Sequence, residues 1–404
     1  MSSNDPSQRV LSGMRPTGKL HLGHLHGVLN NWTQLQHEYD CFFFVADWHA
    51  LTTAYDDTQD LEATSLDMVV SWLAAGVNPG SATLFLQSKV PEHAELHLLL
   101  SMITPLSWLE RVPSYKDMQA KLNDKDLATY GFLGYPLLQA ADILVYRAGN
   151  VPVGADQVAH VELTREVARR FNSIYGREPG FEDLAEAAVK KMGKKAARLY
   201  RELRRGYVEQ GDGDALARAQ ALVAEQQNIS IGDHERLLGY LEGTGRIVLP
   251  EPQALLTSQA KVPGLDGEKM SKSYNNVIAL REDPDVVDQK VRTMQTDPQR
   301  VRRTDPGDPE KCPVYAMHRV YSDEATLAWA ADGCRSAGIG CIDCKKPLID
   351  SINAEQLILR ERARQYEEQP DLVQSILQEG SEKARDAAKD TLEEVRAAIG
   401  IEHR

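Results

Sequence analysis

Two histidines flank a glycine in the stretch SGMRPTGKLHLGH, and their types and spacing suit phosphate binding. His21 and His24 lie three residues apart, so both can face one ligand near a helix start. Imidazoles can donate hydrogen bonds to phosphate oxygens without a permanent positive charge, and Gly23 permits a close backbone approach. This stretch alone leaves three interpretations open: a phosphate cradle, an ordinary turn before a helix, and, less well supported, a zinc half-site.

A second stretch, GLDGEKMSKSYNN, supplies positive charge. It combines two cations, two hydroxyl donors and two glycines that we expect to make the segment mobile: Lys269, Lys272, Ser271, Ser273, Gly264 and Gly267. A loop with two lysines suits the charge that builds up on a leaving pyrophosphate. A basic surface loop without function is the alternative for this stretch read alone.

The elements that must position these residues follow from the apolar patterns. Short apolar runs at 10–14, 41–49 and 82–88 indicate strands, and amphipathic runs at 23–36 and 60–76 indicate helices. Strands that alternate with helices predict an α/β fold with a parallel sheet covered by helices. Ligands of such sheets bind at the carboxyl ends of the strands, which is where the first histidine stretch falls.

The composition along the chain predicts four segments. We expect a Rossmann-like catalytic domain, first part at 1–175, a helical insertion at 176–250, the second catalytic part at 251–285, and an α-helical C-terminal domain at 286–404. The insertion is rich in Ala, Arg, Lys and Glu at helical spacing. Its charge fits a solvated helical surface, and also a surface that touches RNA phosphates.

Bulk properties limit the class of protein. The chain has 404 residues, a formal net charge of −13 and five cysteines. This charge argues against a surface coated with nucleic acid, although a local basic groove is compatible with it. The N-terminus lacks the apolar core of a signal peptide, and no apolar run could span a bilayer. We therefore predict a cytoplasmic protein without a membrane or DNA partner, in which Cys41 is a core residue.

Together the two motifs resemble the paired signature of class I aminoacyl-tRNA synthetases, usually written HIGH and KMSKS. Here they read HLGH and KMSKS. The surrounding stretches SGMRPTGKLHLGH, FFFVADWHALTT, GYPLLQAADILVY and VPVGADQVAHVELTREVARRFN are similar to those of bacterial tryptophanyl-tRNA synthetases. The resemblance covers about residues 9–175 and 251–404, so it assigns no function to the insertion.

The resemblance implies that the protein activates L-tryptophan with ATP and Mg²⁺, then transfers it to tRNA(Trp), as a homodimer. The substrate carboxylate is the nucleophile, so the reaction needs positioning and charge stabilisation rather than a catalytic triad. His21, His24, Lys269 and Lys272 would take the catalytic roles. By resemblance the ATP contacts are Arg15, Pro16, Thr17, Gly23, His24, Gly154, Ala155, Asp156, Val262, Lys269, Met270, Ser271, Lys272 and Ser273, with Arg111 and Lys116 as further phosphate candidates.

The tryptophan pocket also follows from the resemblance. Asp142 would accept the indole N–H, while Tyr135 and Gln157 would hold the ammonium and carboxylate end. An unpaired carboxylate in the apolar stretch PLLQAADILVY would be costly, and we expect bound indole to satisfy it. Gln139 stands where many tryptophanyl enzymes carry Met, and this also resembles the tyrosyl-tRNA synthetase pocket. A tyrosyl enzyme therefore remains the nearest alternative.

Four cysteines cluster late in the chain: Cys312, Cys334, Cys341 and Cys344. Their number and the polar, glycine-rich context predict a tetra-thiolate metal site. Zinc and a [4Fe–4S] cluster both accept four thiolates, and the single C-x2-C pair favours the cluster. The spacing resembles a subset of bacterial tryptophanyl-tRNA synthetases that carry a [4Fe–4S] cluster near the anticodon site. We expect the cluster to shape a lobe that reads the anticodon, beside a basic loop with Arg300, Arg302 and Arg303.

Two further interpretations explain fewer features of the sequence. A HIGH-type nucleotidyltransferase without tRNA leaves the helical C-terminal domain and the full KMSKS unexplained. A non-catalytic iron–sulfur RNA-binding protein leaves the ATP motifs unexplained.

Overall fold

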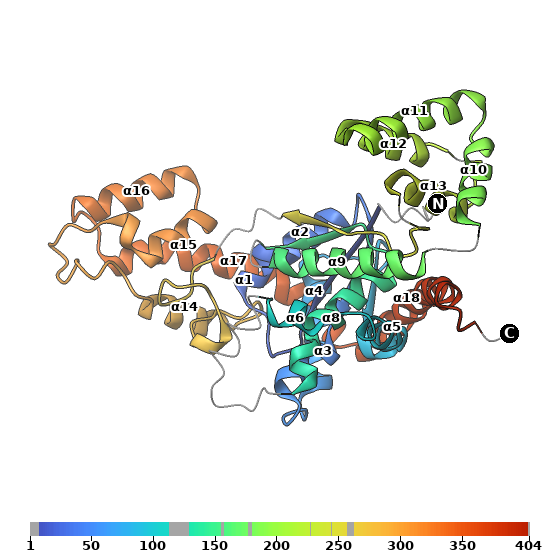
Figure 1. The fold of residues 1–404 in the computed structure, drawn as a ribbon. Helices are drawn as coiled ribbons and strands as arrows, with labels where there is room; N and C mark the ends of the chain where they lie inside the picture. The colour runs from blue at the N-terminus through green and yellow to red at the C-terminus, as the bar shows by residue number, and fades with distance from the viewer. Residues whose placement is uncertain are drawn as a thin grey trace. The chain divides into compact units, whose positions relative to one another are not determined.

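The computed structural model describes residues 8–112, 129–154, 157–176, 180–226, 228–243, 245–256 and 262–402 (Figure 1). The chain divides into two compact units. Unit 1 comprises Met1–Leu11, Lys89–Leu255 and Lys383–Arg404, and unit 2 comprises Ser12–Ser88 and Leu256–Glu382. Each unit combines segments that are far apart in the sequence.

A five-stranded sheet runs in the order β3-β2-β1-β4-β5. Its strands are β1 (Arg9–Met14), β2 (Asp40–Val45), β3 (Ala82–Leu86), β4 (Asn150–Val153) and β5 (Gln253–Leu256). β2 and β3 pair in parallel with Cys41 opposite Ala82, and β1 pairs in parallel with β4. Cys41 is fully buried in β2, as expected of a core residue. The predicted α/β fold with a parallel sheet is confirmed.

Unit 2 surrounds its strands with helices that include both sequence motifs. They are α1 (Leu22–His24), the π-helix η2 (Leu25–Leu29), α2 (Asn30–Leu35), α3 (Asp47–Ala54), α4 (Leu61–Ala75), α14 (Pro284–Thr293), α15 (Pro313–Tyr321), α16 (Glu324–Arg335) and α17 (Cys341–Glu367), with the 3₁₀ turns η3 (Gln87–Lys89), η5 (Lys272–Tyr274) and η6 (Pro309–Lys311). The long helix α17 packs against α4 and α14. One buried apolar cluster joins Leu22 and Met270 of the motifs to Ile352 of α17, so the motifs share a core with the C-terminal helices.

Unit 1 is mostly helical. It contains α5 (Glu92–Ser101), α6 (Leu106–Glu110), α8 (Tyr130–Val145), α9 (Val158–Tyr175), α10 (Phe181–Lys191), α11 (Lys194–Gln210), α12 (Gly213–Ala224) and α13 (Ile231–Glu242). α8 packs between α5 and α9. The final helix α18 (Pro370–Ile399) begins in unit 2 and ends in unit 1.

Polar side chains fix several helix starts, as their sequence positions suggest. The Thr129 hydroxyl accepts a hydrogen bond from the backbone N–H of Phe132 at the start of α8. Ser230 and Asp323 do the same for α13 and α16. These caps satisfy N–H groups that have no partner within their own helix.

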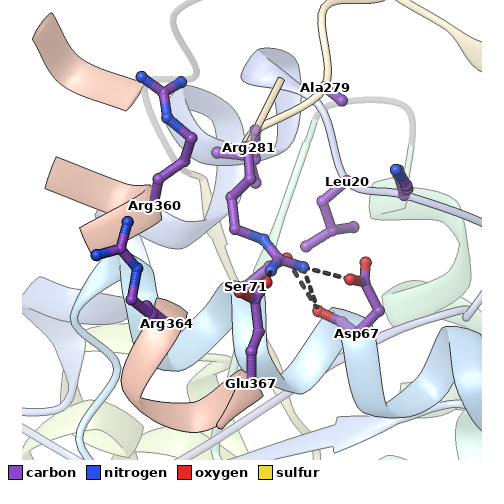
Figure 2. A pocket seen from close by; sticks show the side chains of 10 residues that line it. Leu20, Asp67, Ser71, Ala279, Arg281, Arg360, Arg364 and Glu367 are labelled. Atoms are coloured by element: carbon purple, nitrogen blue, oxygen red, sulfur yellow. Dashed lines mark hydrogen bonds and ion pairs between the residues drawn. The ribbon is translucent and has the colours of Figure 1, made fainter. Parts of the chain in front are cut away.

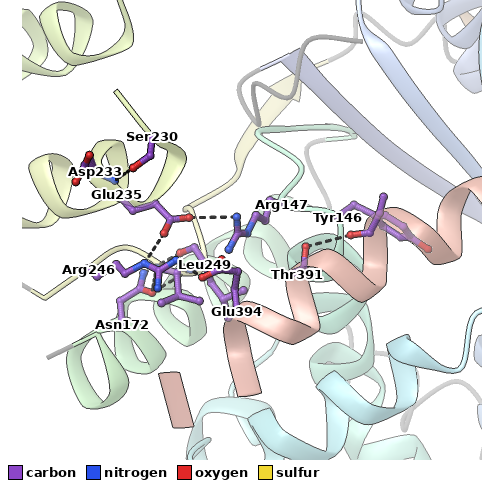
Figure 3. Close-up of polar contacts among 12 residues, drawn as sticks. Tyr146, Arg147, Asn172, Ser230, Asp233, Glu235, Arg246, Leu249, Thr391 and Glu394 are labelled. Carbon is purple, nitrogen blue, oxygen red and sulfur yellow. Dashed lines mark hydrogen bonds and ion pairs between the residues drawn. The ribbon is translucent and has the colours of Figure 1, made fainter. Parts of the chain in front are cut away.

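The helices α10–α13 enclose their own apolar core, with Tyr200, Val223 and Leu237 fully buried. Glu235 of α13 connects this bundle to the rest of unit 1 (Figure 3). Its carboxylate forms ion pairs with the guanidinium of Arg147 at 3.1 Å and with that of Arg246 at 2.5 Å. Asn172 of α9 accepts hydrogen bonds from the backbone N–H groups of Val248 and Leu249. The predicted insertion is therefore helical and held by buried polar contacts.

No helix in the described ranges is both long enough and apolar enough to cross a membrane. The cytoplasmic location remains a prediction from the sequence, as do the four segment boundaries.

We expect Gly380→Ala to destabilise the fold, because α18 approaches β3 through this glycine. A Cβ at position 380 would lie 1.9 Å from the Leu84 carbonyl oxygen, so helix or strand must move. Overpacking of this kind costs about 1–3 kcal/mol, which thermal unfolding would detect. Gly213→Ala in α12, where a Cβ meets nothing within 4 Å, is the matched control and should leave the melting temperature unchanged or raise it. Equal melting temperatures for both variants would contradict the close packing.

Candidate functional site

The first histidine motif follows β1 across a short turn. Gly18 has a φ of +102°, a conformation that L side chains rarely adopt, so glycine is required in this turn. His21 is the extended residue that precedes α1, and its backbone N–H donates to Nδ1 of His24 at 3.2 Å. The two imidazole centroids lie 3.8 Å apart. A Cβ on Gly23 would lie 3.0 Å from the His21 ring, so this glycine lets the ring pack over the backbone.

The segment after KMSKS runs antiparallel beside the first motif. The backbone N–H of Leu22 donates to Ile278 at 3.1 Å, and that of Leu280 donates to Leu20 at 2.9 Å. His21 forms a β-bridge with Ala279. These bonds hold the segment that follows KMSKS beside the first motif within unit 2, although the two are distant in the sequence.

The two motif lysines have different environments. Lys269 is exposed, whereas Lys272 is half-buried and its Nζ donates to the carbonyl oxygens of Thr17 and Gly18 at 3.1 and 2.7 Å. Met270 between them is buried in the shared apolar core. Lys272 therefore fixes the KMSKS segment to the turn before HLGH, and Lys269 extends into solvent.

Burial and the nearby lysines keep both imidazoles neutral. Burial, followed by the charges of Lys272 and Lys269, lowers the pKa of His21 to about 4. Burial and the neighbouring His21 lower the pKa of His24 to about 3. Burial also lowers the pKa of Lys272 to about 8. At neutral pH the site thus offers neutral N–H donors beside ammonium groups, and Nδ1 of His21 is buried without a hydrogen-bond partner among the described residues.

Asn276 organises the KMSKS loop and was not identified from the sequence. Its buried side-chain amide donates to Asp266 and to the carbonyl of Lys269, and its oxygen accepts from the N–H of Ser271 at 2.7 Å. A Cβ on Gly264 would lie 2.2 Å from the Asn276 amide nitrogen, and Gly267 has a φ of +90°. Close packing and backbone conformation thus explain both glycines, whereas the sequence analysis assigned them to mobility. The only signal in the sequence was the Asn-Asn pair that begins two residues after the motif.

The remaining nucleotide candidates differ in burial and in the unit to which they belong. Arg15 and Thr17 are exposed beside the turn, while Pro16 and Val262 are buried and Ser271 is half-buried. The carbonyl of Gly154 accepts from the N–H of Gln157 at the start of α9, which belongs to unit 1. Ala155, Asp156, Lys116 and the side chain of Ser273 lie outside the described part. Arg111 is exposed, and its Nε donates to the Ser107 carbonyl.

Three of the four predicted amino-acid contacts share one face of α8 in unit 1. Tyr135, Gln139 and Asp142 follow one another at spacings of four and three, which places them in line on a helix. The Gln139 side-chain oxygen lies 2.5 Å from Nδ1 of His160, whose ring centroid lies 5.6 Å from that of Tyr135. Gln157 is half-buried just before α9. His160 is a neighbour of these residues that the sequence analysis missed.

Asp142 has a protein partner that the sequence did not suggest. Oδ1 of Asp142 lies 2.6 Å from Nδ1 of His93, a fully buried residue in the first turn of α5. This carboxylate therefore has a partner within the protein besides the expected indole N–H. The sequence places the two residues on separate helices, and only the packing of α5 against α8 brings them together.

The four late cysteines lie at helix ends in unit 2. Cys312 precedes α15, Cys334 lies near the end of α16, and Cys341 and Cys344 lie in the first turn of α17. Burial, followed by the charges of the other three thiols, raises the pKa of Cys344 to about 12. Within the described ranges, no group of three or more His, Cys, Asp or Glu side chains has the arrangement that holds a metal ion.

Basic side chains surround these thiols. Arg300 is buried and donates to the carbonyls of Arg303 and Ile339, so it supports the cysteine-bearing loops rather than facing solvent with Arg302 and Arg303. Lys345 is buried, and its Nζ donates to the carbonyls of Arg292 and Met294.

A pocket of about 310 Å³ lies beside the segment that follows KMSKS (Figure 2). Arg281 lies within it and forms ion pairs with Asp67 of α4 and Glu367 of α17. Arg360 of α17 donates to the Glu282 carbonyl at 2.7 Å. None of the predicted site residues lines this pocket. We therefore assign the charged side chains that line it to holding the KMSKS-bearing segment against α4 and α17.

Comparisons with known proteins agree on one family. A family model described as tRNA synthetases class I (W and Y) matches residues 3–199 and 227–355. The chain is 64% identical over 394 residues to the tryptophan–tRNA ligase of Ralstonia nicotianae, covering 98% of each chain. It is 44% identical over 395 residues to that of Thermotoga maritima, covering 97% of this chain and 99% of the relative.

A solved structure is also similar along nearly the whole chain. It is the tryptophanyl-tRNA synthetase of Campylobacter jejuni, complexed with ADP and tryptophan. The TM-score is 0.72 at 28% identity, with 97% of this chain and 99% of that chain covered.

We expect Asn276→Ala to loosen the KMSKS loop without unfolding the protein. The substitution removes three hydrogen bonds that close the loop, so trypsin should cleave after Lys269 and Lys272 faster than in the unsubstituted protein. Asn30→Ala, at an exposed position of α2, is the control. Unchanged cleavage in Asn276→Ala would show that other contacts hold the loop.

Proposed function

The chain belongs to the class I tRNA synthetases of the tryptophan and tyrosine family, and we infer from this that it is a tryptophan–tRNA ligase. It activates L-tryptophan with ATP to tryptophanyl-adenylate and pyrophosphate, and then transfers tryptophan to the 3′ end of tRNA(Trp). The observation that carries this function is the pairing of HLGH with the segment after KMSKS, together with the hydrogen bonds from Lys272 to the turn before HLGH. These contacts bring hydrogen-bond donors of both motifs together within unit 2.

The activation step requires placement and charge stabilisation. A carboxylate oxygen of tryptophan forms a bond to the α-phosphorus of ATP, and the bond from that phosphorus to the bridging oxygen breaks with its electrons moving to pyrophosphate. Mg²⁺ accompanies ATP because the triphosphate needs charge neutralisation. We propose that the neutral His21 and His24 donate to phosphate oxygens, while Lys269 and Lys272 stabilise the charge that develops on pyrophosphate. No proton transfer is needed, which agrees with imidazoles that stay neutral.

The tryptophan pocket is proposed on α8 and at the start of α9. Asp142 accepts the indole N–H, Gln139 lines the pocket, and Tyr135 and Gln157 bind the amino and carboxyl groups. The common face of Tyr135, Gln139 and Asp142 supports this assignment. We also propose that the protein acts as a homodimer, as the family resemblance implies.

Amino-acid-dependent exchange of pyrophosphate with ATP tests the function. We expect tryptophan to support exchange at concentrations where tyrosine does not, because the two substrates present different hydrogen-bonding groups to the same carboxylate. Exchange driven by tyrosine alone would instead identify a tyrosyl enzyme. No exchange with any amino acid would contradict activation altogether.

We expect the activation rate at low ATP to fall as the pH rises through about 8, where the half-buried Lys272 loses its proton. The pKa of Lys272 is depressed, so the cation is present below this pH and lost above it. In Lys272→Arg the guanidinium stays charged, and the alkaline decline in kcat/KM for ATP should move to higher pH. Lys269→Arg, at the exposed lysine of the same loop, is the matched control. If the alkaline decline in kcat/KM for ATP occurs at the same pH in Lys272→Arg as in the unsubstituted protein, Lys272 is not its cause.

We further propose that Cys312, Cys334, Cys341 and Cys344 bind a [4Fe–4S] cluster, with Zn²⁺ as the alternative. Four sulfur donors suit either group, and a four-iron cluster separates its ligands more widely than one ion does. The nearby Arg300 and Lys345 are positioned to balance thiolate charge. The bound group would fix the loops before α15 and α17 and so shape a surface for the tRNA anticodon, without redox chemistry.

Cys341→Ser should abolish metal binding, because it removes one of four thiolates. Iron, acid-labile sulfide and visible absorbance, measured after anaerobic purification, should be present in the unsubstituted protein and absent in this variant. Cys41→Ala, at a buried cysteine of β2, should keep the metal. One zinc ion per chain without acid-labile sulfide would show that the four cysteines bind zinc instead of a [4Fe–4S] cluster. Intact charging of tRNA by metal-free Cys341→Ser would refute the role in anticodon reading.

A further inference from the structure

A buried chain of three polar side chains connects α5 to α8 in unit 1. His93 lies between Asp142 and Tyr146, with Nδ1 2.6 Å from Oδ1 of Asp142 and Nε2 2.7 Å from the Tyr146 hydroxyl. Exposed fractions are 0% for His93 and Tyr146 and 1% for Asp142. At this burial each of the three groups influences where its neighbours' protons lie.

The direction of donation in this chain follows the tautomer of His93. Burial raises the pKa of the Tyr146 phenol well above its ordinary value, so it keeps its proton. If this proton points to Nε2 of His93, the neutral imidazole carries its own proton on Nδ1. An imidazolium would carry a proton there as well. In both cases Nδ1–H donates to Asp142, whose carboxylate is then an ionised acceptor.

We propose that His93, oriented by Tyr146, is a positioning residue that keeps Asp142 an ionised acceptor and so makes the pocket select an amino acid with a ring N–H. This inference rests on the proposed function and adds a specificity determinant to it. A carboxylate has about four lone-pair positions, so one that already accepts from His93 can also accept from an indole. The specificity thus depends on a residue that does not touch the substrate.

The physical reason lies in the cost of a buried carboxylate. Loss of the Nδ1–H donor shifts the balance at position 142 toward the protonated acid, the form that burial favours. A carboxylic acid donates as well as accepts, so it no longer penalises a ring that lacks an N–H. The neighbouring Glu92 does not take the place of Asp142, because its carboxylate pairs with Arg385 at 2.9 Å.

A satisfied core histidine is the competing explanation, and the two differ in what they predict. A purely structural histidine affects stability and all substrates alike. A positioning histidine changes the ratio between tryptophan and the analogue in which sulfur replaces the indole N–H, β-(3-benzothienyl)alanine. The ratio is therefore informative even in a variant that is less stable.

The test compares kcat/KM for these two amino acids in ATP–pyrophosphate exchange, using the full-length protein. His93→Leu should reduce the preference for tryptophan about tenfold, the equivalent of one hydrogen bond to a charged group. His93→Asn keeps an N–H donor near the position of Nδ1 and should restore most of the preference. Tyr146→Phe removes only the hydroxyl and should reduce the preference about threefold.

An unchanged ratio in both His93→Leu and Tyr146→Phe would overturn the proposal and leave a core histidine. If His93→Leu does not fold, Tyr146→Phe and His93→Asn decide: equal ratios in Tyr146→Phe and the unsubstituted protein would overturn it. Absence of tryptophan-driven exchange in the unsubstituted protein would overturn the proposed function itself, and this inference with it.

Discussion

The antiparallel contact between residues 20–22 and 278–280 is the constraint on which the nucleotide site depends. Two backbone hydrogen bonds and the β-bridge from His21 to Ala279 align HLGH with the segment that follows KMSKS. Helix α17 holds the same segment from its other side, because Gln356 donates to the Ala279 carbonyl. The loop between Pro263 and Asn276 is therefore anchored at its end, and Lys272 reaches the turn at Thr17 and Gly18.

The electrostatics of the site follow from this contact. Burial and the nearby ammonium groups disfavour a positive charge on either imidazole, so both imidazoles remain neutral hydrogen-bond donors. Lys272 donates hydrogen bonds to carbonyl oxygens, which orient the ammonium without neutralising it. A phosphate-bearing ligand would meet permanent dipoles and cations that need little rearrangement.

The rest of the structure shows how buried polar groups are paired. Asp142 pairs with His93, Glu235 with Arg147 and Arg246, and the buried Lys345 with backbone carbonyls. The contacts of Asp142 with His93, of Glu235 with Arg147 and of Lys345 with Met294 join elements that are not neighbours in the sequence. Because a buried charge without a partner is costly, these pairs fix how helices pack as well as how the side chains are charged.

The sequence by itself determined the features that depend on local order. Apolar periodicity predicted the parallel α/β fold, and the two motifs predicted a phosphate site with His21, His24 and Lys272. Tertiary structure alone decided which residues meet across elements: Asn276 closing the KMSKS loop, His93 bonding Asp142, and Arg300 buried near the cysteines. The reason is physical. Periodicity and turns are set by neighbours within a few residues, whereas a hydrogen-bond partner for a buried group depends on which distant helix packs against it.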